Sequence, residues 1–190
     1  MGFENMLTKS MATQLYTGIM TDTGSFRFPA TTAVTHTVIA HLITLGAESA
    51  TIYQNVYDTK TIDQIQLLGV ALKNLSILND FNTAYISLTQ DELDNHNFKK
   101  GDTEGFVNYA LSIFGIKFAV IFIESKQEKI IKISFRSKGS FSVNKFARNH
   151  FNGGGHTNAA GGRSEQSLDK TITEFISILP HYKNDLTHVV

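Results

Sequence analysis

Three consecutive glycines, Gly153 to Gly155, constrain the fold of this chain more than any other feature, because glycine loses more conformational freedom on folding than any other residue. A backbone without side chains lets a ligand approach closely, and successive amides can form a concave anion site. His156 follows directly, and a helix that starts at or after it would add its positive end. The segment therefore predicts an oxyanion-binding loop, and the alternative is a flexible connection.

Composition limits the classes of function that fit the sequence. The 190 residues include 17 basic and 17 acidic side chains, so small phosphorylated ligands fit better than duplex DNA. The chain has no cysteine, which excludes disulfides, thiolate metal sites and cysteine nucleophiles. No segment approaches the roughly 20 apolar residues of a membrane span, and the N-terminus lacks a signal-peptide pattern. We expect a cytoplasmic globular protein with no membrane contact.

Helical spacing of apolar residues dominates the first sixty residues. It predicts one helix before a loop at 21–24, a second helix that starts after Pro29 and ends at Gly46, and a third over 48–57. The predicted buried residues are Met6, Ala12, Leu15 and Tyr16 in the first helix, and Val34, Val38, His41 or Leu42, and Leu45 in the second.

A longer helix is predicted over 61–79. Thr61 and Gln64 form a capping box at its start. Its predicted apolar stripe consists of Ile65, Leu68, Leu72 and Leu75. We place the domain boundary at this helix.

Strands and helices alternate after the boundary. Segments 84–88, 117–124 and 130–136 predict strands, and the last two form a hairpin that turns near Gln127. The predicted helices begin at the Thr89–Glu92 capping box, cover 106–114 and 143–151, and end with a segment before Pro180. This alternation predicts an α/β domain with helices packed on a small mixed sheet.

Three segments carry a resemblance to a known family. GGGHTNAAGG, residues 153–162, resembles the signature of the DHH-associated domain, the substrate-binding domain of DHH phosphoesterases. SFRSKGSFSVNKFARNHF, residues 134–151, resembles the strand, arginine and helix that lead into that signature. YTGIMTDTGSFRF, residues 16–28, resembles the last metal-binding motif of the preceding catalytic domain. The nano-RNase and 3′-phosphoadenosine 5′-phosphate phosphatase branch is the most similar group.

The resemblance implies an α/β fold with three parts. Residues 1–60 would be the C-terminal portion of a DHH catalytic domain, 61–79 a linker helix, and 80–190 the DHH-associated domain. The Asp-His-His triplet that names the family is absent from these residues. We therefore expect the C-terminal part of a longer phosphoesterase, whose N-terminal half is missing or lies in another chain, and which binds substrate better than it cuts it. The resemblance leaves a homodimer open.

Asp22 is the candidate metal ligand. It lies in a TDTG turn, where a short carboxylate can project into a cleft, and Mn²⁺ or Mg²⁺ prefers such oxygen ligands. Aspartate before Thr-Gly is also common as a plain turn or cap. The resemblance implies that Asp22 is the family's catalytic, metal-binding aspartate. One carboxylate does not hold a pair of ions, so the other ligands would come from the missing part.

The candidate substrate ligands are Arg136, Ser137, the glycines Gly153, Gly154 and Gly155, and His156. A guanidinium binds two phosphate oxygens in planar geometry, and an imidazole donates a hydrogen bond to a third. The alternatives are an exposed arginine at a strand end and a histidine that satisfies a loop carbonyl. The resemblance carries the phosphate-binding role over to Arg136 and extends it to Ser137.

The expected activity is metal-dependent hydrolysis of short oligoribonucleotides or of nucleotide phosphates such as 3′-phosphoadenosine 5′-phosphate. In this reading the chain supplies the substrate-binding domain and one metal ligand. Two alternatives stay open: a non-catalytic nucleotide- or RNA-binding module, and a structural domain in which the glycines only form a tight corner.

Overall fold

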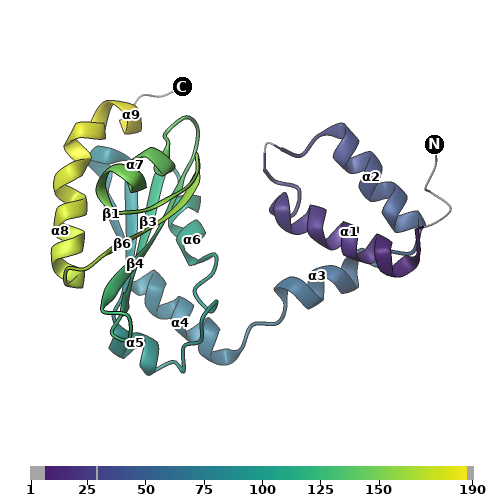
Figure 1. Ribbon diagram of the computed structural model, residues 1–190, viewed down its shortest axis with the longest axis horizontal. Helices are drawn as coiled ribbons and strands as arrows, with labels where there is room; N and C mark the ends of the chain where they lie inside the picture. The colour runs from purple at the N-terminus through teal and green to yellow at the C-terminus, as the bar shows by residue number, and fades with distance from the viewer. Residues whose placement is uncertain (1–6, 29, 188–190) are drawn as a thin grey trace. The chain divides into compact units, whose positions relative to one another are not determined.

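The computed structural model describes residues 7–28 and 30–187, and these divide into two compact units (Figure 1). The first unit ends at Lys60 and the second begins at Thr61. Each unit has its own apolar core. In the described part of the chain, no helix is long and apolar enough to cross a membrane.

The first unit consists of helices α1 (Lys9–Asp22), α2 (Ala33–Thr44) and α3 (Ser49–Tyr57). The hydroxyls of Thr8 and Thr32 cap α1 and α2 by accepting hydrogen bonds from backbone amides. Gly46, with φ +97°, follows the end of α2, as the sequence predicts. The core of the unit consists of Ala12, Tyr16, Met20, Ile39, Leu42, Ala47 and Ile52.

The predicted buried faces of α1 and α2 are partly wrong. Leu15 is 48% exposed, and Val34 and Val38 are 71% and 41% exposed. The predictions for Ala12, Tyr16 and Leu42 are confirmed, and Met20 in α1 and Ile39 in α2 are buried in addition. Both helices therefore carry a second apolar face outside this core. Met6 and Pro29 lie outside the described residues.

The predicted helix over 61–79 is shorter than expected. Helix α4 covers Ile62–Lys73, with the predicted Thr61–Gln64 capping box, and strand β1 (Ser76–Leu78) follows it. Its buried residues are Leu67 and Ala71, whereas Ile65 and Leu72 of the predicted stripe are 51% and 42% exposed. Leu67 and Ala71 pack in the core of the second unit, so α4 is part of that unit and not a separate linker.

A mixed sheet forms the centre of the second unit, with six strands among its described residues in the order β1-β2-β3-β4-β6-β5. β2 and β3 are parallel, and the other neighbouring pairs are antiparallel. The predicted hairpin of β3 and β4 is confirmed. The remaining strands are β2 (Thr83–Leu88), β3 (Phe118–Ser125), β4 (Ile130–Ser137), β5 (Gly154–His156) and β6 (Ala159–Ser164).

Helices cover the two faces of this sheet unequally. On one face, α7 (Val143–His150) and α8 (Leu168–Ile178) pack over β3, β4 and β6 around Phe118, Phe135, Phe146 and Phe175. On the other face, α4, α5 (Gln90–Asp94) and α6 (Phe106–Ser112) cover mainly β2 and β3. Residues 179–182 form the short 3₁₀ helix η3, and α9 (Lys183–Thr187) follows it.

The segment after the glycines is not helical, which corrects the sequence expectation. Gly154–His156 and Ala159–Ser164 are the two strands of a hairpin, joined by Thr157 and Asn158. The small residues of AAGG let the strand pass close to bulky neighbours. A Cβ at Gly162 would lie 2.9 Å from the carbonyl oxygen of Phe151 and 3.0 Å from the Phe135 ring.

Candidate functional site

Arg136 and His156 lie in one row across the sheet. Arg136 of β4 pairs with Ala159 of β6, and Ala159 pairs in turn with His156 of β5. Directly opposite residues of antiparallel strands share a face, and two strand spacings separate the outer residues by roughly 10 Å. The structure therefore brings together the arginine and the histidine that the sequence singles out, with the small Ala159 between them.

The guanidinium of Arg136 is partly buried and forms one hydrogen bond within the described residues. Burial lowers the pKa of its guanidinium, and the nearby carboxylate of Glu104 opposes part of this shift. An arginine stays protonated at neutral pH despite such a shift. Nη1 donates to the carbonyl oxygen of Phe135 at 2.9 Å, which leaves the other guanidinium donors for a ligand. No described carboxylate forms an ion pair with Arg136, so its charge is not neutralised by direct contact.

Hydrogen bonds fix the turn at Thr157 and Asn158, directly after His156. The carbonyl oxygen of Thr157 accepts from the amide of Val143 at 2.8 Å, and that of Asn158 accepts from the amide of Ser137 at 3.1 Å. The Asn158 amide group donates to the Ser137 hydroxyl and to the Gly139 carbonyl oxygen. The His156 ring is exposed and has no hydrogen bond to the described residues. A fixed turn with an exposed imidazole is suited to binding.

The glycine amides do not form the predicted convergent anion site. The amide of Gly153 donates to the carbonyl oxygen of Ala147 at 3.2 Å, and that of Gly155 donates to Asn144 Oδ1 at 3.1 Å. Close packing explains two of the three glycines. A Cβ at Gly153 would lie 2.0 Å from the Gly161 carbonyl oxygen, and one at Gly155 would lie 2.5 Å from that of Ala159. Gly154 has ordinary space around it.

Arg148 is a further candidate that sequence reasoning missed. It lies on α7, and its Nε donates to Asn144 Oδ1 at 3.0 Å, the same oxygen that accepts from Gly155. Its Nη2 lies 3.5 Å from the position of a Cβ on Gly154. A second guanidinium therefore lies beside the glycine strand, that is, β5 with Gly154 and Gly155. Arg148 lies only five residues before Gly153, and this proximity in the sequence could have drawn attention to it. Its orientation towards Gly154 depends on the packing of α7.

Ser137 does not join Arg136 and His156. Its side chain is on the opposite face of β4, as alternation along a strand requires, and the residue is 6% exposed. The hydroxyl donates to the Phe141 carbonyl oxygen at 2.7 Å and accepts from Asn158 at 2.9 Å. In this arrangement, Ser137 supports the loop and the turn beside the candidate site and has no free proton for a phosphate.

Replacing Ser137 with alanine is expected to lower the free energy of unfolding by about 2 kcal/mol, because it leaves buried partners unsatisfied. Ser140→Ala is the matched control in the same loop, since Ser140 is exposed, and it should change the stability by less than about 0.5 kcal/mol. Urea unfolding followed by circular dichroism measures both values. Equal stabilities would contradict the supporting role of Ser137.

Asp22 is the last residue of α1 in the first unit, and its side chain is exposed. Among the described residues, no group of three or more histidine, cysteine, aspartate or glutamate side chains could hold a metal ion. Mg²⁺ takes six oxygen ligands in octahedral geometry, and one exposed carboxylate supplies only one or two of them. The described residues alone therefore do not make a metal site, and Asp22 would have to act with ligands from elsewhere.

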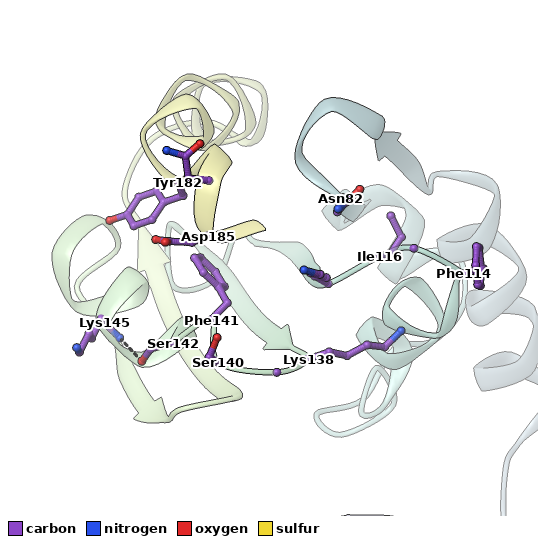
Figure 2. A pocket seen from close by; sticks show the side chains of 14 residues that line it. Asn82, Phe114, Ile116, Lys138, Ser140, Phe141, Ser142, Lys145, Tyr182 and Asp185 are labelled. Carbon is purple, nitrogen blue, oxygen red and sulfur yellow. Dashed lines mark hydrogen bonds between the residues drawn. The ribbon is translucent and has the colours of Figure 1, made fainter. Parts of the chain in front are cut away.

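An open pocket with a volume of about 840 Å³ lies beside the loop after β4 (Figure 2). Lys138 and Lys145 border it, and Phe141 and Tyr182 form part of its wall. Neither Arg136 nor His156 lines this pocket. It is therefore a neighbouring cavity and a competing location for a ligand.

Comparison with known proteins supports a relationship over most of the chain. The chain is 33% identical over 155 residues to the bifunctional oligoribonuclease and PAP phosphatase NrnA of Bacillus subtilis, a match that covers 82% of this chain and 48% of that protein. The protein of the same name from Thermus thermophilus is 30% identical over 154 residues, which covers 81% and 45%. The chain thus spans about half the length of the curated relatives it matches.

A solved structure has the same fold. The crystal structure of an exopolyphosphatase-related protein from Bacteroides fragilis superposes with a TM-score of 0.95 at 38% sequence identity, covering 99% of this chain and 55% of that one. Residues 80–182 match the DHHA1 domain, and this segment contains Arg136, the glycines and His156. The chain therefore belongs to the DHHA1 domain family, as the resemblance of residues 153–162 predicts.

Proposed function

We infer that this chain is the substrate-binding part of a DHH-type phosphoesterase that acts on short oligoribonucleotides or on nucleotides such as 3′-phosphoadenosine 5′-phosphate. The observation that carries the proposal is the row of Arg136, Ala159 and His156 across three strands. Arg136 would bind two oxygens of a phosphate, and His156 would donate to the same ligand from the far side of Ala159. The names of the relatives support the nucleotide class of the substrate.

The glycine strand has a more limited role in this proposal than the sequence suggests. Because two of its amides donate within the protein, its contribution is a surface without side chains beside the phosphate. Arg148 would add positive charge along that edge. The resulting site positions a substrate and contains no group that performs hydrolysis by itself.

Hydrolysis requires the second half of the enzyme in this proposal. Asp22 would be one ligand to Mn²⁺ or Mg²⁺, and the other ligands would come from an N-terminal DHH half in the same or another chain. Exposed apolar side chains on the first unit support such a partner, namely Met11, Leu15, Val34 and Val38. They recur at helical spacing on α1 and α2, outside the core of that unit. A homodimer is a separate proposal that a measured molecular mass would test.

Binding of 3′-phosphoadenosine 5′-phosphate to this chain tests the proposal. Arg136→Gln should weaken the affinity by roughly tenfold to a hundredfold, the effect of losing a charge-assisted hydrogen bond worth about 1.5–3 kcal/mol. Lys170→Gln, an exposed position on α8, is the charge control and should change the affinity less than twofold. Titration calorimetry gives both values, and equal affinities for the two variants would refute the proposed site.

Binding without hydrolysis by the complete protein would favour the second candidate, a nucleotide- or RNA-binding module. One observation is compatible with this candidate: among the described residues, Arg136 and His156 lie in one row of the sheet, and no group of three or more metal-ligating side chains is present. A hydrolysis assay with Mn²⁺ and a short RNA, in which Asp22 and the catalytic half are both present, separates the two.

A further inference from the structure

The sheet face that carries Arg136 and His156 is open beyond these two residues. On this face α4, α5 and α6 cover β2 and β3, and α6 also contacts β4, whereas the helices α7 and α8 pack on the opposite face. On β4 the side chains that alternate towards the open face are Lys132, Ser134 and Arg136. None of these three is apolar, so this half of the face is built for solvent or for a polar partner.

A second row of positive charge crosses this face. Lys132 of β4 pairs directly with Arg163 of β6, and both side chains are exposed. The row lies four residues from the Arg136 row, which is about 13 Å along the strands. Ser134 and Gly161 form the intervening pair, and a Cβ at Gly161 would meet only the Ile133 carbonyl oxygen, at 3.7 Å. The small residues Ser134 and Gly161 therefore leave space above the sheet between the Arg136 row and the Lys132 row.

The second row is unfavourable for the fold by itself. Like charges directly opposite each other destabilise an antiparallel pair. Lys132 forms an ion pair with Glu128, whereas the Arg163 guanidinium has no hydrogen bond or ion pair with the described part of the chain. Such a pairing of cations is compensated when an anion lies over it. Charge complementarity therefore favours a polyanion that is long enough to contact both Arg136 and the Lys132–Arg163 pair.

We propose that Lys132 and Arg163 bind a second phosphate of a single-stranded oligonucleotide whose first phosphate is held by Arg136 and His156. The inference rests on the proposed function, because the first row must bind a nucleotide for the second row to extend it. The strand would follow β4 and β6 across Ser134 and Gly161. A mononucleotide is too short to contact both rows, so the second row would make affinity depend on substrate length.

The test compares 5′-phosphorylated oligoadenylates of one and four residues in EDTA, with the full chain. The double variant Lys132→Gln/Arg163→Gln should weaken binding of the tetranucleotide at least tenfold and that of the mononucleotide less than twofold. The slope of log affinity against log salt for the tetranucleotide should become shallower by about 0.7, the share of one phosphate contact on a single strand. Lys73→Gln/Lys170→Gln removes the same charge at exposed positions and should leave both affinities unchanged.

The outcomes separate this inference from the proposed function. If Arg136→Gln weakens mononucleotide binding but the Lys132/Arg163 variant binds the tetranucleotide as tightly as the original chain, only the second row is refuted. An equal loss for both ligand lengths, or an equal loss in the control variant, would also refute it, because it indicates a general effect of charge. If neither ligand binds the original chain, both proposals fail.

Discussion

Replacing Gly153 with alanine is expected to lower the free energy of unfolding by about 3 kcal/mol, because the new methyl group has no space. Its Cβ would lie 2.0 Å from the carbonyl oxygen of Gly161 and 2.7 Å from the Cα of Gly162. Both atoms belong to the backbone of β6, so relief requires the two strands to separate. The same movement would displace His156 and weaken nucleotide binding.

Gly154 supplies the matched control within the same triplet. A Cβ there would lie 3.5 Å from Arg148 Nη2 and 3.6 Å from Asn144 Oδ1, which are ordinary contacts with side chains. Gly154→Ala should therefore change the free energy of unfolding by less than about 1 kcal/mol in either direction. Urea unfolding of the two variants measures the difference. Equal stabilities would show that the triplet is not required for the packing of β5 on β6.

Replacing Asp22 with asparagine should lower the hydrolysis of a short RNA by more than about 100-fold when the chain is joined to a DHH catalytic half. The expected reason is the loss of a charged ligand from a shared metal site, and even residues that only support metal ligands typically contribute 10- to 100-fold. Asparagine preserves the size of the side chain and removes its negative charge. The affinity of the second unit, which contains the DHHA1 domain, for a nucleotide should stay unchanged.

The control for Asp22 is another exposed aspartate of the same unit. Asp58, which follows α3, is exposed, and Asp58→Asn should retain the activity within twofold. Initial rates across a range of Mn²⁺ concentrations distinguish weaker metal binding from a folding defect. Unchanged activity in Asp22→Asn at limiting Mn²⁺ would remove Asp22 from the metal site.

Local sequence signals predicted the elements that depend on local physics. The capping boxes at Thr61 and Thr89 depend on side chains three residues apart, and both are present. The alternation of Ile131, Ile133 and Phe135 defines one face of β4, and all three are buried. These signals do not need information from distant parts of the chain.

The sequence-based predictions were wrong for helices that carry apolar residues on several faces. They also missed a strand whose structure depends on tertiary packing and not on the intrinsic propensity of its residues. Helix α4 carries apolar residues on more than one side, so its periodicity did not show that Leu67 and Ala71 face the core instead of Ile65 and Leu72. The strand at Ala159–Ser164 has residues with little strand propensity. Its pairing with β4 and the close approach of Gly162 to Phe135 decide its structure.

The candidate site was only partly predictable for the same reason. Sequence and resemblance named Arg136 and His156, but their common row depends on the insertion of β6 between β4 and β5. The alternation of Ile131, Ile133 and Phe135 continues to Ser137 and places it on the buried face away from Arg136, but the sequence interpretation did not use this signal. The approach of Arg148 to Gly154 depends on the packing of α7, which is a property of the folded chain.

Side-chain NMR resonances during a titration with 3′-phosphoadenosine 5′-phosphate test the central claim most directly. The Nε–H signal of Arg136 and the ring signals of His156 should show the largest shifts and saturate together, because one phosphate contacts both. Largest shifts at Lys138 and Lys145, with Arg136 and His156 unchanged, would place the ligand in the neighbouring pocket and contradict the account.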